Sequence, residues 1–296
     1  MRLRKITIIG VGLLGGSIGL AAKRRKLVAP GGVAGFVRRL ASLKDCEKAG
    51  AVDFATTDLL AAVWDADLVI LCTPLAQMRS RVQEMLPALK RGAVVTDVGS
   101  VKAGVVRELG PLVAQAGAHF VGSHPMAGAE KTGVGAASAE LFVNAVCVVT
   151  PVKRSNPTAV RKVEQFWRAL GARTLRLAPE EHDLLVSRSS HLPHIMAAAL
   201  ARYVLTPTHP KAQAALCANG FRDTTRIASG SPEMWRDIVL ANAKNLERAM
   251  KEFISDAGKF RRALAKADAK AVTKYFETAK ERRDHWRTRC ASSSPE

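Results

Sequence analysis

The sequence predicts a doubly wound, mostly parallel α/β sheet over residues 1–179, followed by an all-helical domain over residues 180–296. Three observations support this. Short β-branched runs alternate with helical patterns through the first part, which is typical of parallel sheets built from βαβ units. A glycine-rich turn joins the first strand to the first helix. After about Pro179 no strand pattern reappears, and apolar residues recur at helical spacing.

The expected strands are short and apolar, and helical patterns separate them. Strands are predicted at residues 6–9, 33–36, 68–72, 93–96, 119–121, 146–149 and 174–177, with helices at 18–26, 40–49, 77–89, 101–109 and 157–170. In the second part, helices are predicted at 180–205 with a restart at Pro193, and at 211–219, 232–257 and 259–289. One helical face is expected to belong to a core. It consists of Leu240, Ala243, Leu246, Met250, Phe253 and Ile254.

The composition indicates a globular chain, with 48% hydrophobic and 24% charged residues, and excludes a disordered one. A net charge of +19 has three interpretations: a nucleic-acid surface, attraction of anionic substrates, or a basic bias shared by the organism's proteins. The basic residues are spread along the chain without interleaved aromatic side chains, so we expect no nucleic-acid partner. Five scattered cysteines predict neither a disulfide framework nor a metal site, and they fit a reducing cytoplasm.

The N-terminus superficially resembles a secretory signal, because Arg2, Arg4 and Lys5 precede an apolar stretch at residues 6–22. Five glycines interrupt that stretch at a spacing that a nucleotide-binding turn explains better. No other stretch approaches the roughly 20 apolar residues that span a bilayer. We therefore expect a cytoplasmic protein that does not insert into a membrane.

The glycines form a GxGxxG turn between the first strand and the first helix. In such turns the first glycine permits the tight turn, the second lets the backbone approach a pyrophosphate, and the third allows close helix–strand packing. The helix N-terminus then faces the phosphates. This context predicts a Rossmann-type dinucleotide site, and a glycine-rich turn without a ligand is the alternative. The cofactor-binding residues expected here are Gly10, Gly12, Leu13, Leu14 and Gly15.

The second strand ends without the carboxylate that usually bonds the ribose 2′-hydroxyl of NAD. Arg38 and Arg39 stand there instead, and guanidinium groups match phosphate geometry. The pattern therefore favours NADP, with NAD possible if both arginines are simply solvated at the start of a helix. Thr73 and Pro74 close the third strand and are expected to line the nicotinamide side.

Two further segments follow strands and carry polar side chains: residues 97–102 with Ser100, and residues 122–130 with His124 and Glu130. A histidine in a glycine-bounded loop on the cofactor side is positioned for proton transfer, although a lone histidine is more often structural. In the helical part, Ser190 and His194 belong to a Ser-His-Leu-Pro-His segment, which can equally be a helix cap. Its two histidines are three residues apart without an HExxH pattern, so no metal is expected.

Five motifs, in order, resemble those of the prephenate/arogenate dehydrogenase family. They are the glycine turn, Asp97-Val-Gly-Ser-Val-Lys102, Gly122-Ser-His-Pro-Met-Ala-Gly128, Ser190-His-Leu-Pro-His194 and Phe221-Arg-Asp-Thr-Thr-Arg226. The third and fourth are the most specific, and the resemblance extends over about residues 4–283. It implies a Rossmann domain, a helical domain that forms a homodimer, and an active site between the two domains.

The resemblance also implies roles. His124 resembles the catalytic histidine that bonds the substrate's ring hydroxyl, Ser100 the serine that supports it, and Arg226 the arginine that binds a substrate carboxylate. Ser190, His194 and Glu130 resemble pocket residues, and His191 and Asp223 lie beside them. Arg222 stands where some relatives have lysine, so its role is left open. The implied reaction is oxidative decarboxylation of a cyclohexadienol with hydride transfer to NAD(P), giving 4-hydroxyphenylpyruvate from prephenate or tyrosine from arogenate.

Two other classes of protein share parts of this pattern. A β-hydroxyacid dehydrogenase also joins a Rossmann domain to helices, but it is expected to use a lysine of the helical domain as acid/base, and the His-Pro-Met-Ala-Gly segment argues against it. A dinucleotide-binding regulator that exploits the charge of +19 is the alternative without enzymatic activity. The sequence does not distinguish prephenate from arogenate.

Overall fold

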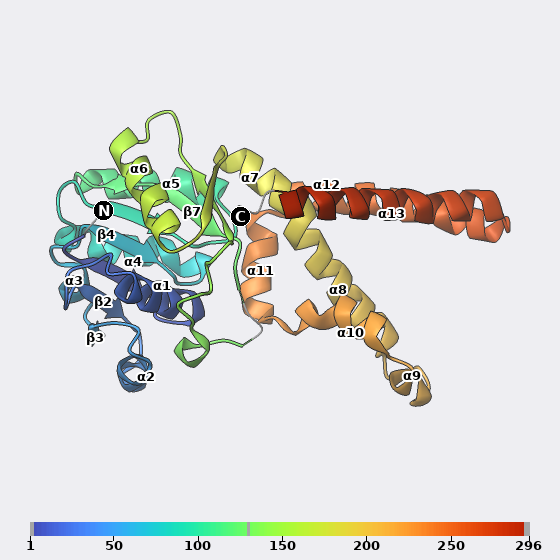
Figure 1. Ribbon diagram of the computed structural model, residues 1–296, viewed down its shortest axis with the longest axis horizontal. Helices are drawn as coiled ribbons and strands as arrows, with labels where there is room; N and C mark the ends of the chain where they lie inside the picture. The colour runs from blue at the N-terminus through green and yellow to red at the C-terminus, as the bar shows by residue number, and fades with distance from the viewer. Residues whose placement is uncertain (1–2, 129–130, 293–296) are drawn as a thin grey trace. The chain divides into compact units, whose positions relative to one another are not determined.

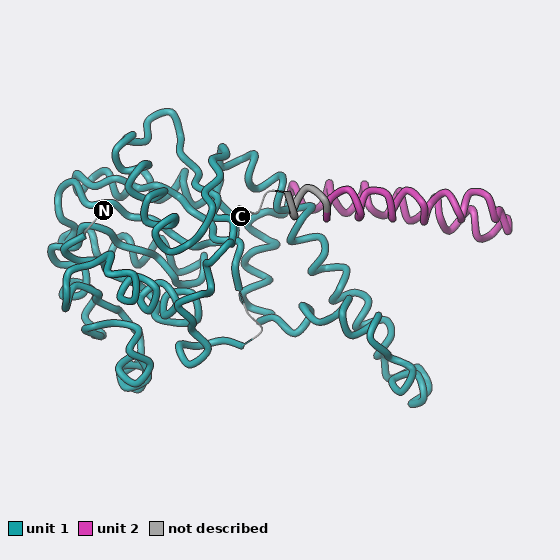
Figure 2. The backbone as a smooth tube through the Cα atoms, viewed as in Figure 1, with its two compact units in different colours: residues 1–243 teal, residues 244–296 magenta. Residues whose placement is uncertain are grey.

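A computed structural model describes residues 3–128 and 131–292 of the chain (Figure 1). The chain divides into two compact units, residues 1–243 and residues 244–296 (Figure 2). The first unit holds every strand in the described part of the chain, and the second consists of helices.

The expected doubly wound parallel sheet is confirmed. Within the described residues it has six parallel strands in the order β3-β2-β1-β4-β5-β6. The strands are β1 (Ile6–Ile9), β2 (Val33–Phe36), β3 (Phe54–Thr56), β4 (Leu68–Leu71), β5 (Val94–Asp97) and β6 (His119–Phe120). β1 pairs with both β2 and β4, so the strand order reverses beside β1. Ligands bind at the carboxyl edge of such a reversal point.

Helices cover both faces of this sheet. Two hydrophobic clusters show the division: one includes Ile18 and Trp167 from α1 and α6, and the other includes Leu59, Met78 and Leu109 from α3, α4 and α5. Both clusters contain fully buried strand residues, which explains why the strands are mostly apolar. The helices are α1 (Leu13–Arg24), α2 (Ala41–Ala49), α3 (Leu59–Val63), α4 (Leu75–Met85), α5 (Ala103–Gln115) and α6 (Pro157–Ala169).

The apolar N-terminal stretch is a structural part of this sheet. Its first four residues form the buried central strand β1, and the rest forms the glycine turn and α1. In the described part of the chain, no helix is both long and apolar enough to cross a membrane. Strand β3 and helix α3 were not expected, because a three-residue, partly exposed edge strand leaves little hydrophobic pattern in the sequence.

A second, smaller sheet corrects the expectation that His124 lies in a loop. His124 belongs to β7 (Gly122–Pro125), which pairs antiparallel with β8 (Val146–Thr150), and β8 pairs parallel with β9 (Arg173–Arg176). His124 lies opposite Val148. Gly122 permits this close pairing, since a Cβ atom there would lie 2.5 Å from the Thr150 hydroxyl. The histidine is therefore held by a sheet and not by a loop.

Helices follow without further strands among the described residues of the second part, as expected. The predicted restart at Pro193 is confirmed, because a π-helical turn at Ser187–His191 precedes α8, which begins at Leu192. The first unit contains α7 (Pro179–Val186), α8 (Leu192–Val204), α9 (Ala212–Ala215), α10 (Asn219–Thr225), a 3₁₀ turn (Arg226–Ser229) and α11 (Pro232–Ala241). The predicted helix 232–257 is wrong as one element, since it breaks at Asn242, whose amide donates to the Asp183 carbonyl at 2.7 Å.

The second unit is a pair of long helices, α12 (Ala243–Ala265) and α13 (Ala269–Ser292). The chain turns at Ala267, which has a φ of +50°, and Asp268 caps α13. The break expected near residue 258 is therefore about ten residues too early. The ring of Phe260 lies 4.7 Å from that of Tyr275, which joins the two helices.

The helical face expected to belong to a core is only partly buried. Leu246 is buried, but Leu240 is 67% exposed and Ile254 is 61% exposed. The spacing of these residues correctly predicted helices with an apolar face. It did not show whether this chain covers that face. Large exposed apolar side chains at this spacing are typical of helices that associate with another chain.

Candidate active site

The glycine turn has the geometry that its spacing predicts. Gly10 has a φ of +97°, and a Cβ atom there would lie 3.0 Å from the Cys72 carbonyl oxygen. A Cβ atom on Gly15 would lie 2.2 Å from the Gly10 carbonyl oxygen, whereas one on Gly12 would meet only open space. The first and third glycines are therefore required by packing within the chain. The second leaves room beside the backbone for a ligand.

The residues around this turn fit a dinucleotide phosphate. Helix α1 begins at Leu13 without a side-chain cap and without an acidic residue in its first turn, so its N-terminal N–H groups are available to an anion. Leu13 and Leu14 are half-buried in that turn. The Thr73 hydroxyl is buried without a hydrogen-bond partner in the described structure, and its side chain lies beside Gly10. Pro74 is exposed at the start of α4.

Arg38 and Arg39 lie where β2 leaves the sheet next to this turn. The Gly10 N–H donates to the Phe36 carbonyl at 3.0 Å, so β2 and the turn are in contact two residues before Arg38. Val37 is buried, whereas both arginines are exposed to solvent. Their position is thus compatible with contact to a group on the ribose of a bound dinucleotide.

The loop after β5 is fixed by a buried ion pair. The Lys102 ammonium and the Asp97 carboxylate are in direct contact and are both fully buried. Asp97 also accepts from the Gly99 N–H at 2.8 Å and from the Ser123 N–H at 3.2 Å. Burial lowers the pKa of Lys102, and Asp97 opposes that effect. This pair determines the course of the loop that carries the half-buried Ser100.

Strand β7 is anchored through the residue before His124. The Ser123 hydroxyl donates to the Asp97 carbonyl at 2.6 Å and accepts from the Trp167 indole N–H at 3.0 Å. Side chains alternate along a strand, so the next residue, His124, points to the opposite side. There its Nδ1 lies 2.9 Å from Nε2 of His182, at the start of α7.

His124 is held in its neutral form. Burial lowers the pKa of His124 well below its ordinary value, and the nearby Lys102 ammonium lowers it further. His182 in turn contacts the Asp183 carboxylate through Nδ1 at 2.8 Å. The arrangement is a buried row of His124, His182 and Asp183, in which a neutral imidazole is available as a proton acceptor.

Two more histidines continue this row in α8 and the turn before it. Burial lowers the pKa of His191 to about 4, and the Asn242 amide lies 3.2 Å from its Nδ1. His194 stacks on the indole of Trp235 with ring centroids 3.4 Å apart, and burial lowers the pKa of His194 as well. These rings are therefore also neutral near pH 7, and they form an aromatic wall.

His194 and Trp235 border a cavity of about 430 Å³. Its lining includes Arg226, in the 3₁₀ turn after α10, together with His194 and Trp235, so the fold brings two predicted substrate-binding residues together. Ser190 is half-buried in the π-helical turn, and neither it nor Ser100 nor His124 lines this cavity. Glu130 lies outside the described residues. The remaining lining residues are Gly128, Thr132, Ile227, Ser229, Gly230, Ser231 and Met234.

Sequence reasoning missed His182, Asp183 and Trp235. His182 and Asp183 follow the Pro179 boundary in the first turns of a helix, and no motif marks them. The one available signal was a His-Asp pair close to a domain boundary, where ligands often bind. Trp235 was part of a helical pattern and showed no sign of stacking on His194.

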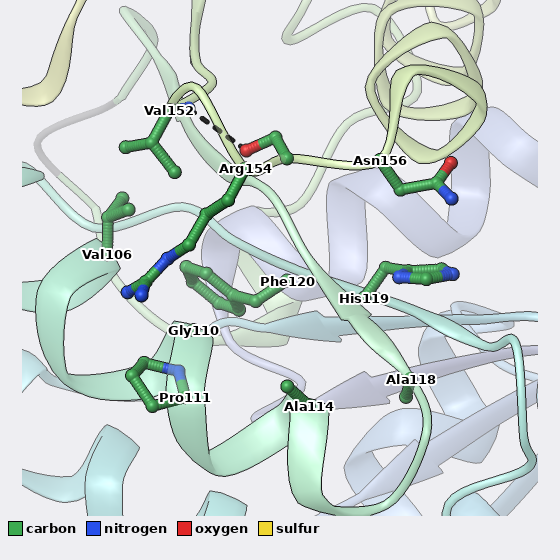
Figure 3. A pocket seen from close by; sticks show the side chains of 11 residues that line it. Val106, Gly110, Pro111, Ala114, Ala118, His119, Phe120, Val152, Arg154 and Asn156 are labelled. Carbon is green, nitrogen blue, oxygen red and sulfur yellow. Dashed lines mark hydrogen bonds between the residues drawn. The ribbon is translucent and has the colours of Figure 1, made fainter.

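A second hollow, of about 160 Å³, lies elsewhere, between α5, β6 and the segment 152–156 (Figure 3). Arg154 reaches past the ring of Phe120, and the Ser155 hydroxyl accepts from the Val152 N–H at 2.9 Å. None of the predicted site residues lines this hollow. Throughout the described residues, no group of three or more histidine, cysteine or acidic side chains is arranged to hold a metal ion.

A glycine turn at the reversal point of a parallel sheet, with a neutral histidine beyond it, defines a nicotinamide-dependent dehydrogenase of the Rossmann class. Two family descriptions match the chain: "Prephenate dehydrogenase, nucleotide-binding domain" over residues 24–176 and "Prephenate dehydrogenase, dimerization domain" over residues 178–278. The chain therefore belongs to the prephenate dehydrogenase family.

Individual relatives agree with this assignment. The chain is 36% identical to prephenate dehydrogenase of Bacillus subtilis, over 94% of this chain and 75% of the relative. It is 34% identical to cyclohexadienyl dehydrogenase of Zymomonas mobilis, over 95% of both. A crystal structure of prephenate dehydrogenase from A. aeolicus, in complex with hydroxyphenyl propionate and NAD+, superposes with a TM-score of 0.88 at 29% identity, covering 96% of this chain and 99% of the other.

Proposed function

We propose that this protein oxidises prephenate or arogenate with NAD(P) and releases carbon dioxide, giving 4-hydroxyphenylpyruvate or tyrosine. The observation that carries the proposal is the buried, neutral His124 held by His182, in a chain of the prephenate dehydrogenase family. Curated relatives that are named prephenate and cyclohexadienyl dehydrogenases support the choice of substrate class.

The proposed reaction needs few groups from the protein. A bound nicotinamide would supply the hydride acceptor. His124 takes the proton of the ring hydroxyl as the carbinol carbon loses hydride, and Ser100 supports this contact. The ring carboxylate leaves as carbon dioxide, and its bonding electrons make the ring aromatic and leave a phenolate oxygen. That oxygen takes the proton back from His124, which restores the hydroxyl group and the neutral histidine. Aromatisation drives the reaction, so the protein mainly positions the reacting groups.

The substrate is an anion, and the cavity wall suits it. Arg226 would bind a substrate carboxylate through two parallel hydrogen bonds. His194 and Trp235 offer a flat apolar wall for a six-membered ring. Ser190 and Glu130 are proposed to complete the pocket. The net charge of +19 would favour the approach of such an anion.

The proposed organisation follows the motif order. Residues 1–179 would bind the dinucleotide, and residues 180–296 would complete the substrate site and form a homodimer. The match of the dimerization domain over residues 178–278 supports this, as do the exposed side chains of Ile254 and Phe276 in the second unit. The four cysteines described, Cys46, Cys72, Cys147 and Cys217, are free thiols, which supports a cytoplasmic location.

The test of the proposed function is a steady-state assay of reduced cofactor at 340 nm, with prephenate and arogenate each combined with NAD and NADP. We expect turnover of at least one substrate, with NADP preferred because Arg38 and Arg39 replace a carboxylate. Absence of turnover in all four combinations, from folded dimeric protein, would contradict the proposed function.

Removing the two arginines together is expected to abolish the preference for NADP. The Arg38→Ser/Arg39→Ser variant should raise the KM for NADP about 10- to 100-fold, since two charge-assisted contacts to a 2′-phosphate are lost. The KM for NAD should change less than about threefold. Arg161→Ser removes an exposed arginine from α6 and serves as the control. Equal effects on NAD and NADP would show that these arginines do not read the 2′ position.

Arg226 is expected to contribute mainly to substrate binding. Arg226→Leu should raise the KM for the substrate by about 10- to 100-fold with a smaller effect on kcat, because a carboxylate contact present before and during the reaction is lost. Arg226→Lys should recover only part of the loss, since lysine cannot bind bidentately. Arg202→Leu, at an exposed site on α8 outside the cavity, is the matched control. An unchanged KM in Arg226→Leu contradicts the assignment.

A further inference from the structure

We propose that His182, held by Asp183, is a positioning residue that fixes the tautomer of His124 and leaves its Nε2 as the proton acceptor. The inference rests on the proposed role of His124 in the reaction. It concerns a residue that no motif of the sequence identified and that lies 58 positions further along the chain.

The argument begins at Asp183, whose two carboxylate oxygens both accept hydrogen bonds. Oδ1 accepts from the Lys102 backbone N–H at 2.7 Å, and Oδ2 accepts from the Ala103 N–H at 2.9 Å. Both donors lie at the N-terminus of α5, where a negative charge is favoured. Asp183 is therefore an ionised acceptor.

The carboxylate determines which nitrogen of His182 carries the proton. Nδ1 of His182 lies 2.8 Å from Oδ1 of Asp183, and a carboxylate oxygen can only accept, so Nδ1 carries the proton. In a neutral imidazole, Nε2 is then an acceptor. His182 is fully buried, so water does not compete for this nitrogen.

The same donor–acceptor argument determines which nitrogen of His124 carries the proton. Nε2 of His182 lies 2.9 Å from Nδ1 of His124, and this contact needs a donor, so Nδ1 of His124 carries the proton. Nε2 of His124 is therefore left with its lone pair. A neutral His124 in the other tautomer would place two lone pairs against each other across 2.9 Å.

The buried row of His124, His182 and Asp183 also connects two parts of the site. Asp183 belongs to α7, after the predicted dinucleotide-binding part, whereas Lys102 and Ala103 follow the loop that carries Ser100. When Nε2 of His124 takes a proton, its Nδ1–H becomes a charge-assisted donor to His182, which strengthens that hydrogen bond. His182 thus acts through His124 and does not need to touch the substrate.

The tautomer can be observed directly in the ligand-free protein. Ring ¹⁵N chemical shifts of ¹⁵N-histidine-labelled wild type, with His124 assigned by His124→Asn, are expected to show a neutral ring protonated at Nδ1. In His182→Leu the His124 signals should move toward the Nε2-protonated form or a mixture. A wild-type His124 that is protonated at Nε2 overturns the proposal, and this measurement does not depend on turnover.

Kinetics give the second readout. His182→Leu is expected to lower kcat about 10- to 100-fold, with the substrate KM and the dinucleotide Kd changed less than threefold. His182→Gln should recover part of the loss, because an amide oxygen can accept from Nδ1 of His124. His119→Asn, outside the proposed site, is the control. A folded His182→Leu with unchanged kcat and ring shifts also overturns the proposal. A wild type with the expected tautomer but no turnover would instead contradict the proposed function.

Discussion

His124→Asn is expected to lower kcat about 100-fold or more, because an amide cannot take the hydroxyl proton as the hydride leaves. Dinucleotide binding should be unchanged, since His124 lies on β7 in the second sheet and the glycine turn follows β1 in the first. The measurement is kcat with the preferred substrate and cofactor, together with cofactor Kd by fluorescence titration. His119→Asn is again the control, and activity within a few-fold of wild type would show that His124 is not the acceptor.

The wild-type pH profile provides a second check on the same residue. Burial and the Lys102 charge hold the pKa of His124 well below its ordinary value of 6.5, so the ring remains neutral as the pH falls through 6.5. The acidic limb of kcat/KM for the free enzyme should therefore lie below pH 6.5.

The lowered pKa of His124 also makes the stability of the folded protein depend on pH. The unfolded chain takes up this proton first, so the contribution of His124 to stability is complete above pH 6.5 and declines below it.

Much of the fold and the cofactor site could be predicted because their causes are local in sequence. The glycines of the turn are required by contacts such as that of Gly15 with the Gly10 carbonyl, only five residues away. The strands of a parallel sheet are buried on both faces, and β-branched, mostly apolar runs such as Ile6–Ile9 reflect this directly. Local causes therefore produced reliable predictions.

The placement of the chemistry could not be read in the same way, because long-range contacts determine it. Residues 122–125 have the composition of a loop, and only pairing with β8 makes them a strand. His182 contacts His124, 58 residues earlier, and its neighbour Asp183 accepts from backbone N–H groups 80 and 81 residues earlier. The predicted core face with Leu240 and Ile254 failed for a related reason, since spacing reveals an apolar face but not what covers it.

The largest effect on stability is expected from the buried ion pair of Lys102 and Asp97. Asp97→Ala should destabilise the protein by about 3–5 kcal/mol, because it leaves the fully buried Lys102 ammonium without its ion-pair partner. Lys102 would retain one partner, the Ser123 carbonyl at 2.9 Å. The variant also removes the acceptor for the Gly99 and Ser123 N–H groups. Thermal unfolding should register the loss as a melting temperature lower by about 10 °C.

A double-mutant cycle separates the interaction between the charges of Lys102 and Asp97 from the other contacts of each side chain. Lys102→Met should cost less than Asp97→Ala, since Asp97 keeps the N–H donors of Gly99 and Ser123 after the ammonium is gone. The double variant should be more stable than the sum of the single losses predicts, by about 0.5–3 kcal/mol, because neither charge is then left unpaired. Additive losses would show that the two side chains act independently, despite their contact. In that case the loop that carries Ser100 would be held by backbone contacts, and the ion pair could not be what positions it.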